Sequence, residues 1–168
     1  MSDYRFEEPD TELALRLRDA EVAALADLAR STRIVLDAPL PPVGDEAVRD
    51  RLFPRAYLDP TEDAAELAFQ AAVHADLASG RIAAINDLLA DLEGAERVRG
   101  GVRVLLDPAR TGRWVAAIND LRLTLGTRIG VSDDDPEPTG PIAADAGDVG
   151  CYHWLTGLQD GLISYLLV

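Results

Sequence analysis

Four residues with a charged or amide side chain interrupt the apolar pattern between positions 114 and 129, and their types are those of an acid–base or ion-pair site. They are Asn119, Asp120, Arg122 and Arg128. A carboxylate near guanidinium groups can bind a charged substrate or move a proton, because charge and burial shift its pKa. Structural ion pairs give the same pattern, since a buried charge has to be paired. We interpret the four residues as a structural network that holds neighbouring elements; a small enzyme with an Asp/Arg polar site is the alternative.

Cys151 is the only cysteine of the chain, and it stands two residues before His153. In a helix, residues two apart point in nearly opposite directions, so this thiol and imidazole do not form a nucleophilic pair. If Asp148 caps the last helix, Cys151 falls in the first turn, where the helix lowers a thiol pKa and the nearby Asp145 and Asp148 raise it. Cys151 is therefore a candidate redox thiol, and an inert half-buried cysteine is the alternative.

The sequence predicts no metal site and no cofactor. The only histidines are His74 and His153, and no His, Cys or carboxylate pair has the spacing of zinc ligands. The run Asp133-Asp134-Asp135 lacks the alternating spacing and the closing glutamate of a calcium-binding loop. The glycines at 126 and 130 follow a helical pattern and no strand, which excludes a phosphate-binding loop.

The elements that would position these residues are mainly helices. Trp114, Ile118, Leu121 and Leu125 recur every three or four positions, which predicts a helix with one buried face. Asp107-Pro108 just upstream has the residue types of an N-cap and a first helical position. We expect this helix to lie at the centre of the fold.

Further segments on both sides complete the predicted fold. Helices are expected at about 20–36, 46–53, 59–78, 81–92 and 149–167, with a break at Ser79-Gly80. Alternation from Tyr4 to Leu17 predicts an N-terminal β-hairpin. Residues 94–101 are expected to form a loop, and residues 102–105 a strand that pairs with this hairpin. The fold class is α+β and predominantly helical, with about six helices and a small antiparallel sheet.

The hexapeptide Ala-Ala-Ile-Asn-Asp-Leu occurs twice, at 83–88 and at 116–121. The separation is near the period of two-helix solenoid repeats. The flanking residues do not match and a third copy is missing. These differences favour chance similarity between two helices rich in Ala and Leu.

Length and composition predict one domain over residues 1–168. The 168 residues are 48% apolar, which is enough for a full-sized core. Residues 132–147 are rich in acids, Pro and Gly, and predict an exposed, mobile acidic loop. The first ten residues are polar rather than a signal peptide, and no apolar run reaches membrane-spanning length. We expect a cytoplasmic protein without membrane contact; its composition fits a monomer and an oligomer equally.

The charge of the chain constrains its partners. Thirty acids face sixteen basic residues, all of them arginine, and the net charge is −14. A protein that binds duplex DNA presents a basic stripe to the phosphates, so we expect no direct binding to nucleic acid. A large negative charge suits a partner with a basic surface, although solubility alone is the simpler explanation.

Three stretches have an order and spacing that resemble a known family. They are Arg51–Tyr57 followed by Asp59-Pro60, Trp114 followed by 119–123 and 125–131, and Tyr152-x-Trp154-Leu155-x-x-Leu158-Gln159. Through these stretches, nearly the whole chain resembles the actinobacterial AosR family of oxidative-stress transcriptional regulators, which was long known only as a domain of unknown function. The resemblance implies a non-enzymatic protein that works through protein contacts, with a sigma factor or other transcription machinery as partner. The family's genes lie beside the adaptor ClpS, so an accessory role in Clp proteolysis is an alternative.

The resemblance also implies a cysteine-based redox switch, from which this sequence departs. With Cys151 alone, a switch needs an intermolecular disulfide or a sulfenic acid. Tyr57 and Trp154 are the candidates for an interaction surface, because exposed aromatic residues often anchor protein contacts.

Overall fold

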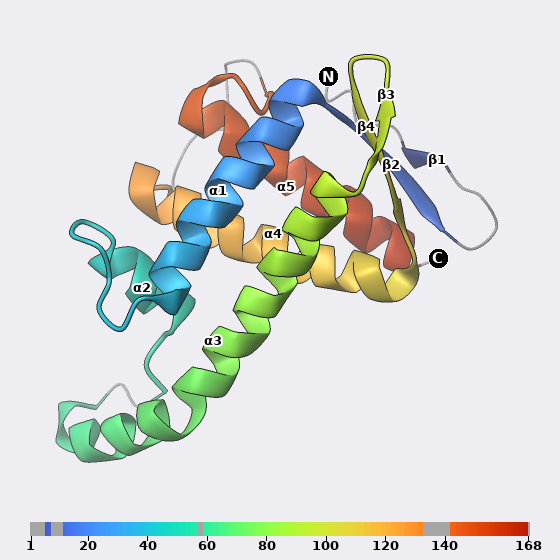
Figure 1. The fold of residues 1–168 in the computed structure, drawn as a ribbon. Coiled ribbons are helices and arrows are strands. Elements are labelled where there is room, and N and C mark those ends of the chain that lie inside the picture. The colour runs from blue at the N-terminus through green and yellow to red at the C-terminus, as the bar shows by residue number, and fades with distance from the viewer. Residues whose placement is uncertain (1–5, 8–11, 57–58, 133–141, 168) are drawn as a thin grey trace.

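The computed structural model describes residues 6–7, 12–56, 59–132 and 142–167, which form a helical bundle with a small sheet at one end (Figure 1). The elements are β1 (Phe6–Glu7), β2 (Leu13–Arg18), α1 (Asp19–Asp37), α2 (Glu46–Leu52), the 3-10 turn η1 (Pro60–Glu62), α3 (Asp63–Glu93), β3 (Glu96–Val98), β4 (Gly101–Leu106), α4 (Pro108–Ile129) and α5 (Gly147–Leu166). This confirms the predominantly helical α+β class. Among the described residues, no helix is both long and apolar enough to cross a bilayer.

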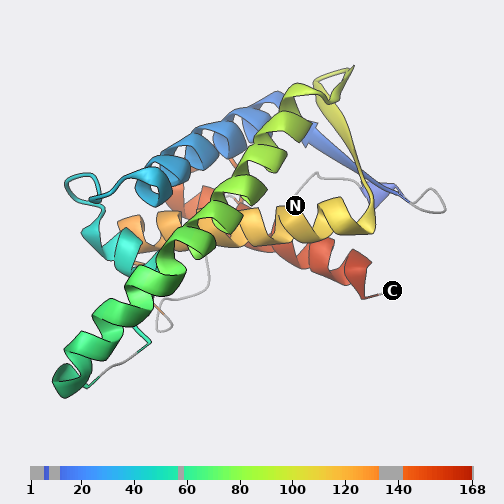
Figure 2. The same ribbon diagram turned by 60° about the horizontal axis from the view of Figure 1, so that its bottom comes forward.

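Helix α4 is the central element, as the sequence predicts. It lies between α1 and α5, and α3 crosses it (Figure 2). Its residues Trp114, Ile118 and Leu121 are fully buried. The helix begins where predicted, because the carboxylate of Asp107 accepts a hydrogen bond of 2.7 Å from the backbone N–H of Arg110.

The sheet has the strand order β1-β2-β4-β3 and is antiparallel throughout. The predicted pairing of the N-terminal hairpin with the strand near 102–105 is confirmed, with Leu15 opposite Val104. The segment 94–101 was expected to be a loop, and this is wrong, because β3 forms a hairpin with β4. Gly100 allows the tight turn with a φ of +82°. A strand of three mostly exposed residues lacks the apolar alternation by which strands are recognised.

Gly101 is the point of closest approach in this sheet. It pairs with Arg18, and a Cβ atom built at Gly101 would lie 1.9 Å from the carbonyl oxygen of Leu17. Because that neighbour is backbone, only glycine fits between the two strands.

Helix α3 is continuous, so the predicted break at Ser79-Gly80 is wrong. One glycine inside a helix costs only about 1 kcal/mol relative to alanine. The burial of Ile85 and Leu88 on the same helix compensates for that cost. The predicted start is confirmed at Asp59, whose carboxylate accepts a 2.9 Å bond from the N–H of Thr61, although a 3-10 turn precedes the α-helix.

The first half of α3 projects away from the bundle (Figures 1 and 2). We call residues 63–77 the arm. Leu67 and Leu77 of the arm are 71% and 50% exposed. The C-terminal half of α3, by contrast, packs against α1 and α4.

Most of the predicted acidic loop at 132–147 lies outside the described residues, at 133–141. Its end is described: Ala144 is buried, and α5 starts at Gly147, two residues before the expected start.

Candidate functional site: a polar network on α4 and a pocket beside it

Asp120 is buried and joins α4 to α3. Its carboxylate accepts a hydrogen bond from Arg81 of α3, whose guanidinium is partly exposed. Burial raises the pKa of Asp120 to about 6, and the positive charge of Arg81 acts in the opposite direction. The pair therefore holds two helices together, but the carboxylate gives up much of its hydration.

Two further ion pairs connect the same helices. Arg113 lies 2.8 Å from a carboxylate oxygen of Asp87, and Arg110 donates to Asp91. Asp87 and Asp120 occupy the same position in the two copies of the repeated hexapeptide. Each copy thus places its aspartate against an arginine of the opposite helix.

Arg122 faces α5. Its guanidinium donates to the hydroxyl of Thr156 at 3.1 Å and to the amide oxygen of Gln159, and it lies 5.5 Å from the ring centroid of Tyr152. Asn119, one turn away on α4, is half-buried.

Arg128 faces α1 and the start of α2. Its Nε and Nη2 donate to both carboxylate oxygens of Asp45, at 2.9 and 2.8 Å, and Nη1 donates to Ser31 at 2.7 Å. This bidentate contact lowers the pKa of Asp45. Asp120, Arg122 and Arg128 therefore contact different neighbours and do not meet at one point.

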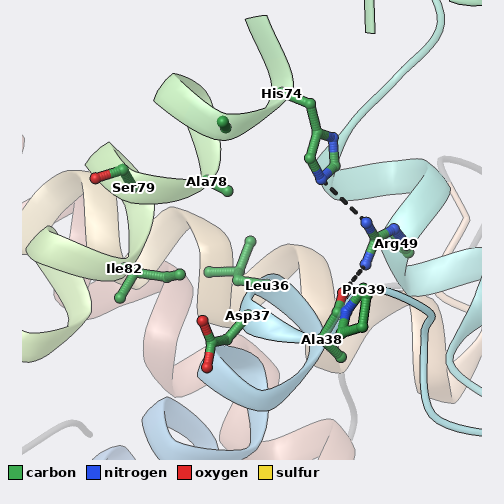
Figure 3. A pocket seen from close by; sticks show the side chains of 10 residues that line it. Leu36, Asp37, Ala38, Pro39, Arg49, His74, Ala78, Ser79 and Ile82 are labelled. Atoms are coloured by element: carbon green, nitrogen blue, oxygen red, sulfur yellow. Dashed lines mark hydrogen bonds between the residues drawn. The ribbon is translucent and has the colours of Figure 1, made fainter. Parts of the chain in front are cut away.

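A pocket of about 480 Å³ lies where the end of α1, helix α2 and helix α3 meet (Figure 3). Its lining residues are Leu36, Asp37, Ala38, Pro39, Arg49, His74, Ala75, Ala78, Ser79 and Ile82. Arg49 and His74 lie on one side of it, and Asp37 and Ser79 on the other.

Arg49 caps the C-terminus of α1. Its Nη1 donates to the carbonyl oxygens of Ala38 at 2.6 Å and of Val35 at 3.4 Å. These carbonyls have no partner within the helix, so a cation here also complements the helix dipole.

His74 is held as a neutral acceptor. Arg49 Nη2 lies 3.0 Å from His74 Nε2, and because a guanidinium only donates, the imidazole carries its proton on Nδ1. Burial and the charge of Arg49 lower the pKa of His74. Its ring packs on Phe53, with 4.2 Å between centroids. With its lone pair occupied, His74 is not placed to act as a general base.

Trp154 is fully buried in the core, so its predicted role in an exposed interaction surface is wrong. It stands on the face of α5 that also buries Leu155 and Leu158. Periodicity places an aromatic residue on a helix, but it does not say which face a neighbouring helix will cover. Tyr57, the other candidate, lies outside the described residues.

Cys151 lies in the second turn of α5, because the helix begins at Gly147 with Ala146 as its N-cap. Its side chain is half-buried. Burial, and then the charge of Asp148, raise the pKa of the thiol to about 11. At neutral pH the group is the thiol, which is the less reactive form.

We therefore expect Cys151 to react slowly with iodoacetamide in the folded protein. The thiolate fraction near pH 7.5 should be lower than that of an unstructured cysteine, whose pKa is about 8.5. The rate is measured by mass spectrometry, with the urea-unfolded chain as the control. A folded-state rate equal to or above the unfolded rate would contradict this assignment and support a redox thiol.

The projecting arm was not foreseen from the sequence. A helix was expected at about 59–78. The available signal was the run 67–75, Leu-Ala-Phe-Gln-Ala-Ala-Val-His-Ala, which carries no acid and no arginine. Only the structure shows that the body of the protein leaves Leu67 and Leu77 exposed.

Comparison with known proteins supports the resemblance in the sequence. The chain is 36% identical to the oxidative stress regulator AosR of Mycobacterium tuberculosis H37Rv over an aligned segment of 67 residues. This segment covers 40% of this chain and 31% of that protein. It is 40% identical to the putative oxidative stress regulator AosR of Mycobacterium leprae over 67 residues, 39% of this chain and 30% of that protein. The match thus spans about a third of the length of these relatives.

No solved structure matches the chain. The model of one protein family, described as a domain of unknown function (DUF2017), matches residues 3–166. This match includes every helix and strand described above. The chain therefore belongs to the DUF2017 family.

Proposed function

We propose that this chain is a non-enzymatic regulator of the oxidative-stress response that binds a protein of the transcription machinery in the cytoplasm, with a sigma factor as the expected partner. The observation that carries the proposal is the match to proteins named oxidative stress regulator AosR, in a chain that the DUF2017 family matches over residues 3–166.

The state of the reactive side chains supports a binding role. The imidazole of His74 is engaged by Arg49, burial and a nearby acid disfavour the thiolate of Cys151, and Asp120 is buried against Arg81. In the described part of the chain, no group of three or more His, Cys, Asp or Glu side chains could hold a metal ion. Most of the side chains that could take part in catalysis are thus engaged in contacts that stabilise the fold.

The charge supports a basic partner and disfavours DNA. A net charge of −14 repels phosphate, and it accelerates the encounter with a positively charged surface. Sigma factors carry such surfaces because they bind promoter DNA. The association rate with the partner should therefore fall clearly between low and physiological salt, with less change in the dissociation rate.

The test is affinity purification of the tagged chain from its native host, with and without peroxide, followed by binding of the purified candidates. We expect a sigma factor or an RNA polymerase subunit to be enriched over an unrelated acidic protein of similar size. Enrichment of Clp proteins alone would favour the proteolytic role instead. Tight binding of the isolated chain to random duplex DNA at physiological salt would contradict the proposal.

A further inference from the structure

The arm of α3 has the composition of a buried helix. Ten of its fifteen residues are Ala, Leu, Phe or Val. Helices that are apolar on most sides are usually covered by other elements. The arm nevertheless projects from the bundle, and Leu67 and Leu77 are largely exposed (Figures 1 and 2). An exposed apolar segment of this kind marks a contact surface.

The charge around the arm indicates what kind of surface would cover it. The segment from Ala56 to Gly80 contains five acids and no arginine. Arg55, directly before it, pairs with Asp63, and Glu66 is buried, so the exposed acids outside these contacts are Asp59, Glu62 and Asp76. A second copy would bring its own exposed acids close to these three, which is unfavourable. A surface with positive charges around an apolar centre would be attracted to the same segment.

We propose that the arm, together with the pocket at its base, is the docking site for a protein partner whose surface presents an apolar groove edged with arginine or lysine. This inference rests on the proposed function, in which the chain acts by binding a protein. It adds the place of contact and the chemistry of the partner's surface.

The pocket gives this docking site an anchor for one basic side chain. Leu36 and Ile82 supply apolar walls for the methylene groups of an arginine or lysine. Asp37 is exposed and lines the pocket, so its carboxylate can pair with the cationic end. Arg49, which caps α1 and donates to His74, lies on the other side of the pocket from Asp37, so the cationic end is expected at the Asp37 side (Figure 3).

The arm is already helical, which lowers the cost of binding. Fifteen helical residues span about 22 Å, at 1.5 Å per residue. Because α3 continues into the bundle, where Ile85 and Leu88 are buried, the arm is held before any partner arrives. A partner therefore does not have to order it, and more of the contact energy appears as affinity.

The test uses a labelled synthetic helical peptide of about 20 residues as the probe, with leucines on one face and arginines and lysines on both flanks. Its affinity for the full chain is measured by fluorescence anisotropy. Replacing both Leu67 and Leu77 with serine should weaken binding at least tenfold, as expected for central apolar anchors. Asp37→Asn should weaken binding several-fold. Slower amide exchange of residues 63–77 in the complex should locate the contact.

The matched control is Leu167→Ser combined with Asp160→Asn, which changes an exposed leucine and an exposed acid in the last turns of the chain. The C-terminus lies on the side of the molecule away from the arm (Figure 1). This variant should bind the probe like the parent. A second probe, with the same leucines but glutamates on its flanks, should bind neither the variants nor the parent.

Three results would overturn the inference. One is failure of the parent to bind the basic probe, and another is equal affinity of the arm variant and the control. The third is a concentration-dependent dimer in ultracentrifugation that the serine substitutions abolish, because the arm would then belong to a second copy. Failure of the proposed function looks different: no transcription protein is recovered from the host, whatever the peptide shows. If a sigma factor is recovered and binds the variant with serine at Leu67 and Leu77 as tightly as the parent, the arm is not the docking site. The proposed function then still holds.

Discussion

Replacing Asp120 with asparagine should remove a pH dependence of about 3 kcal/mol from the free energy of unfolding between pH 4 and pH 7. The parent Asp120 has a pKa of about 6 in the folded chain, against 3.8 for the ordinary group. Each unit of pKa difference corresponds to about 1.4 kcal/mol. Asparagine has a similar shape and can still accept the hydrogen bond from Arg81, but it does not titrate.

The sign follows from which state holds the proton. Between the two pKa values the unfolded chain has lost the proton of Asp120 and the folded chain keeps it, so raising the pH favours unfolding. The contribution of Asp120 is fully present below its unfolded pKa and is lost as the pH rises through about 6. The parent should therefore lose stability relative to the asparagine variant over this interval.

The measurement is urea unfolding of both proteins from pH 4 to pH 7.5, with the difference plotted against pH. Asp45→Asn is the control of opposite sign, because Arg128 lowers the pKa of Asp45. The stabilising contribution of Asp45 is present above its unfolded pKa and is lost as the pH falls towards its folded pKa. If the parent and Asp120→Asn show the same pH dependence, burial does not hold the proton on Asp120.

Gly101→Ala should destabilise the protein by about 3 kcal/mol, the upper part of the range for overpacking. The added Cβ would meet the carbonyl oxygen of Leu17 at 1.9 Å, and this backbone atom can move only if β2 and β4 separate.

The matched substitution is Gly112→Ala, inside α4, where a Cβ atom meets nothing within 4 Å. Here alanine should stabilise the protein by up to about 1 kcal/mol, because glycine loses more backbone entropy in a helix. Thermal and urea unfolding of both variants check the pair. Equal shifts of the two midpoints would show that the close contact at Gly101 does not control stability.

Local patterns in the sequence predicted the elements with strong periodicity and clear caps. The central helix was expected from Trp114, Ile118 and Leu121, and its start from Asp107, whose side chain does cap the first turn. The break at Ser79-Gly80 was wrong because a glycine signal is local, whereas the burial of Ile85 and Leu88 that sustains α3 depends on distant helices.

The candidate site was less predictable, because it depends on contacts between distant segments. The polar residues Asp120 and Arg128 are evident in the sequence, but their partners Arg81 and Asp45 lie 39 and 83 positions away. The contact of Arg49 with His74 spans 25 positions and belongs to no recognisable motif. The burial of Trp154 likewise depends on how α5 is placed on α4.

The unbroken α3 also has a mechanical consequence. Of the three ion pairs that join described residues of α3 to α4, the one between Arg81 and Asp120 is nearest to the arm, and Asp63 at the start of the helix lies 18 residues from it, about 27 Å along the helix. A change of 10° in the direction of a segment of that length would displace its end by about 5 Å. Small changes of angle where α3 meets α4 would therefore appear as displacements of several ångströms at the start of α3.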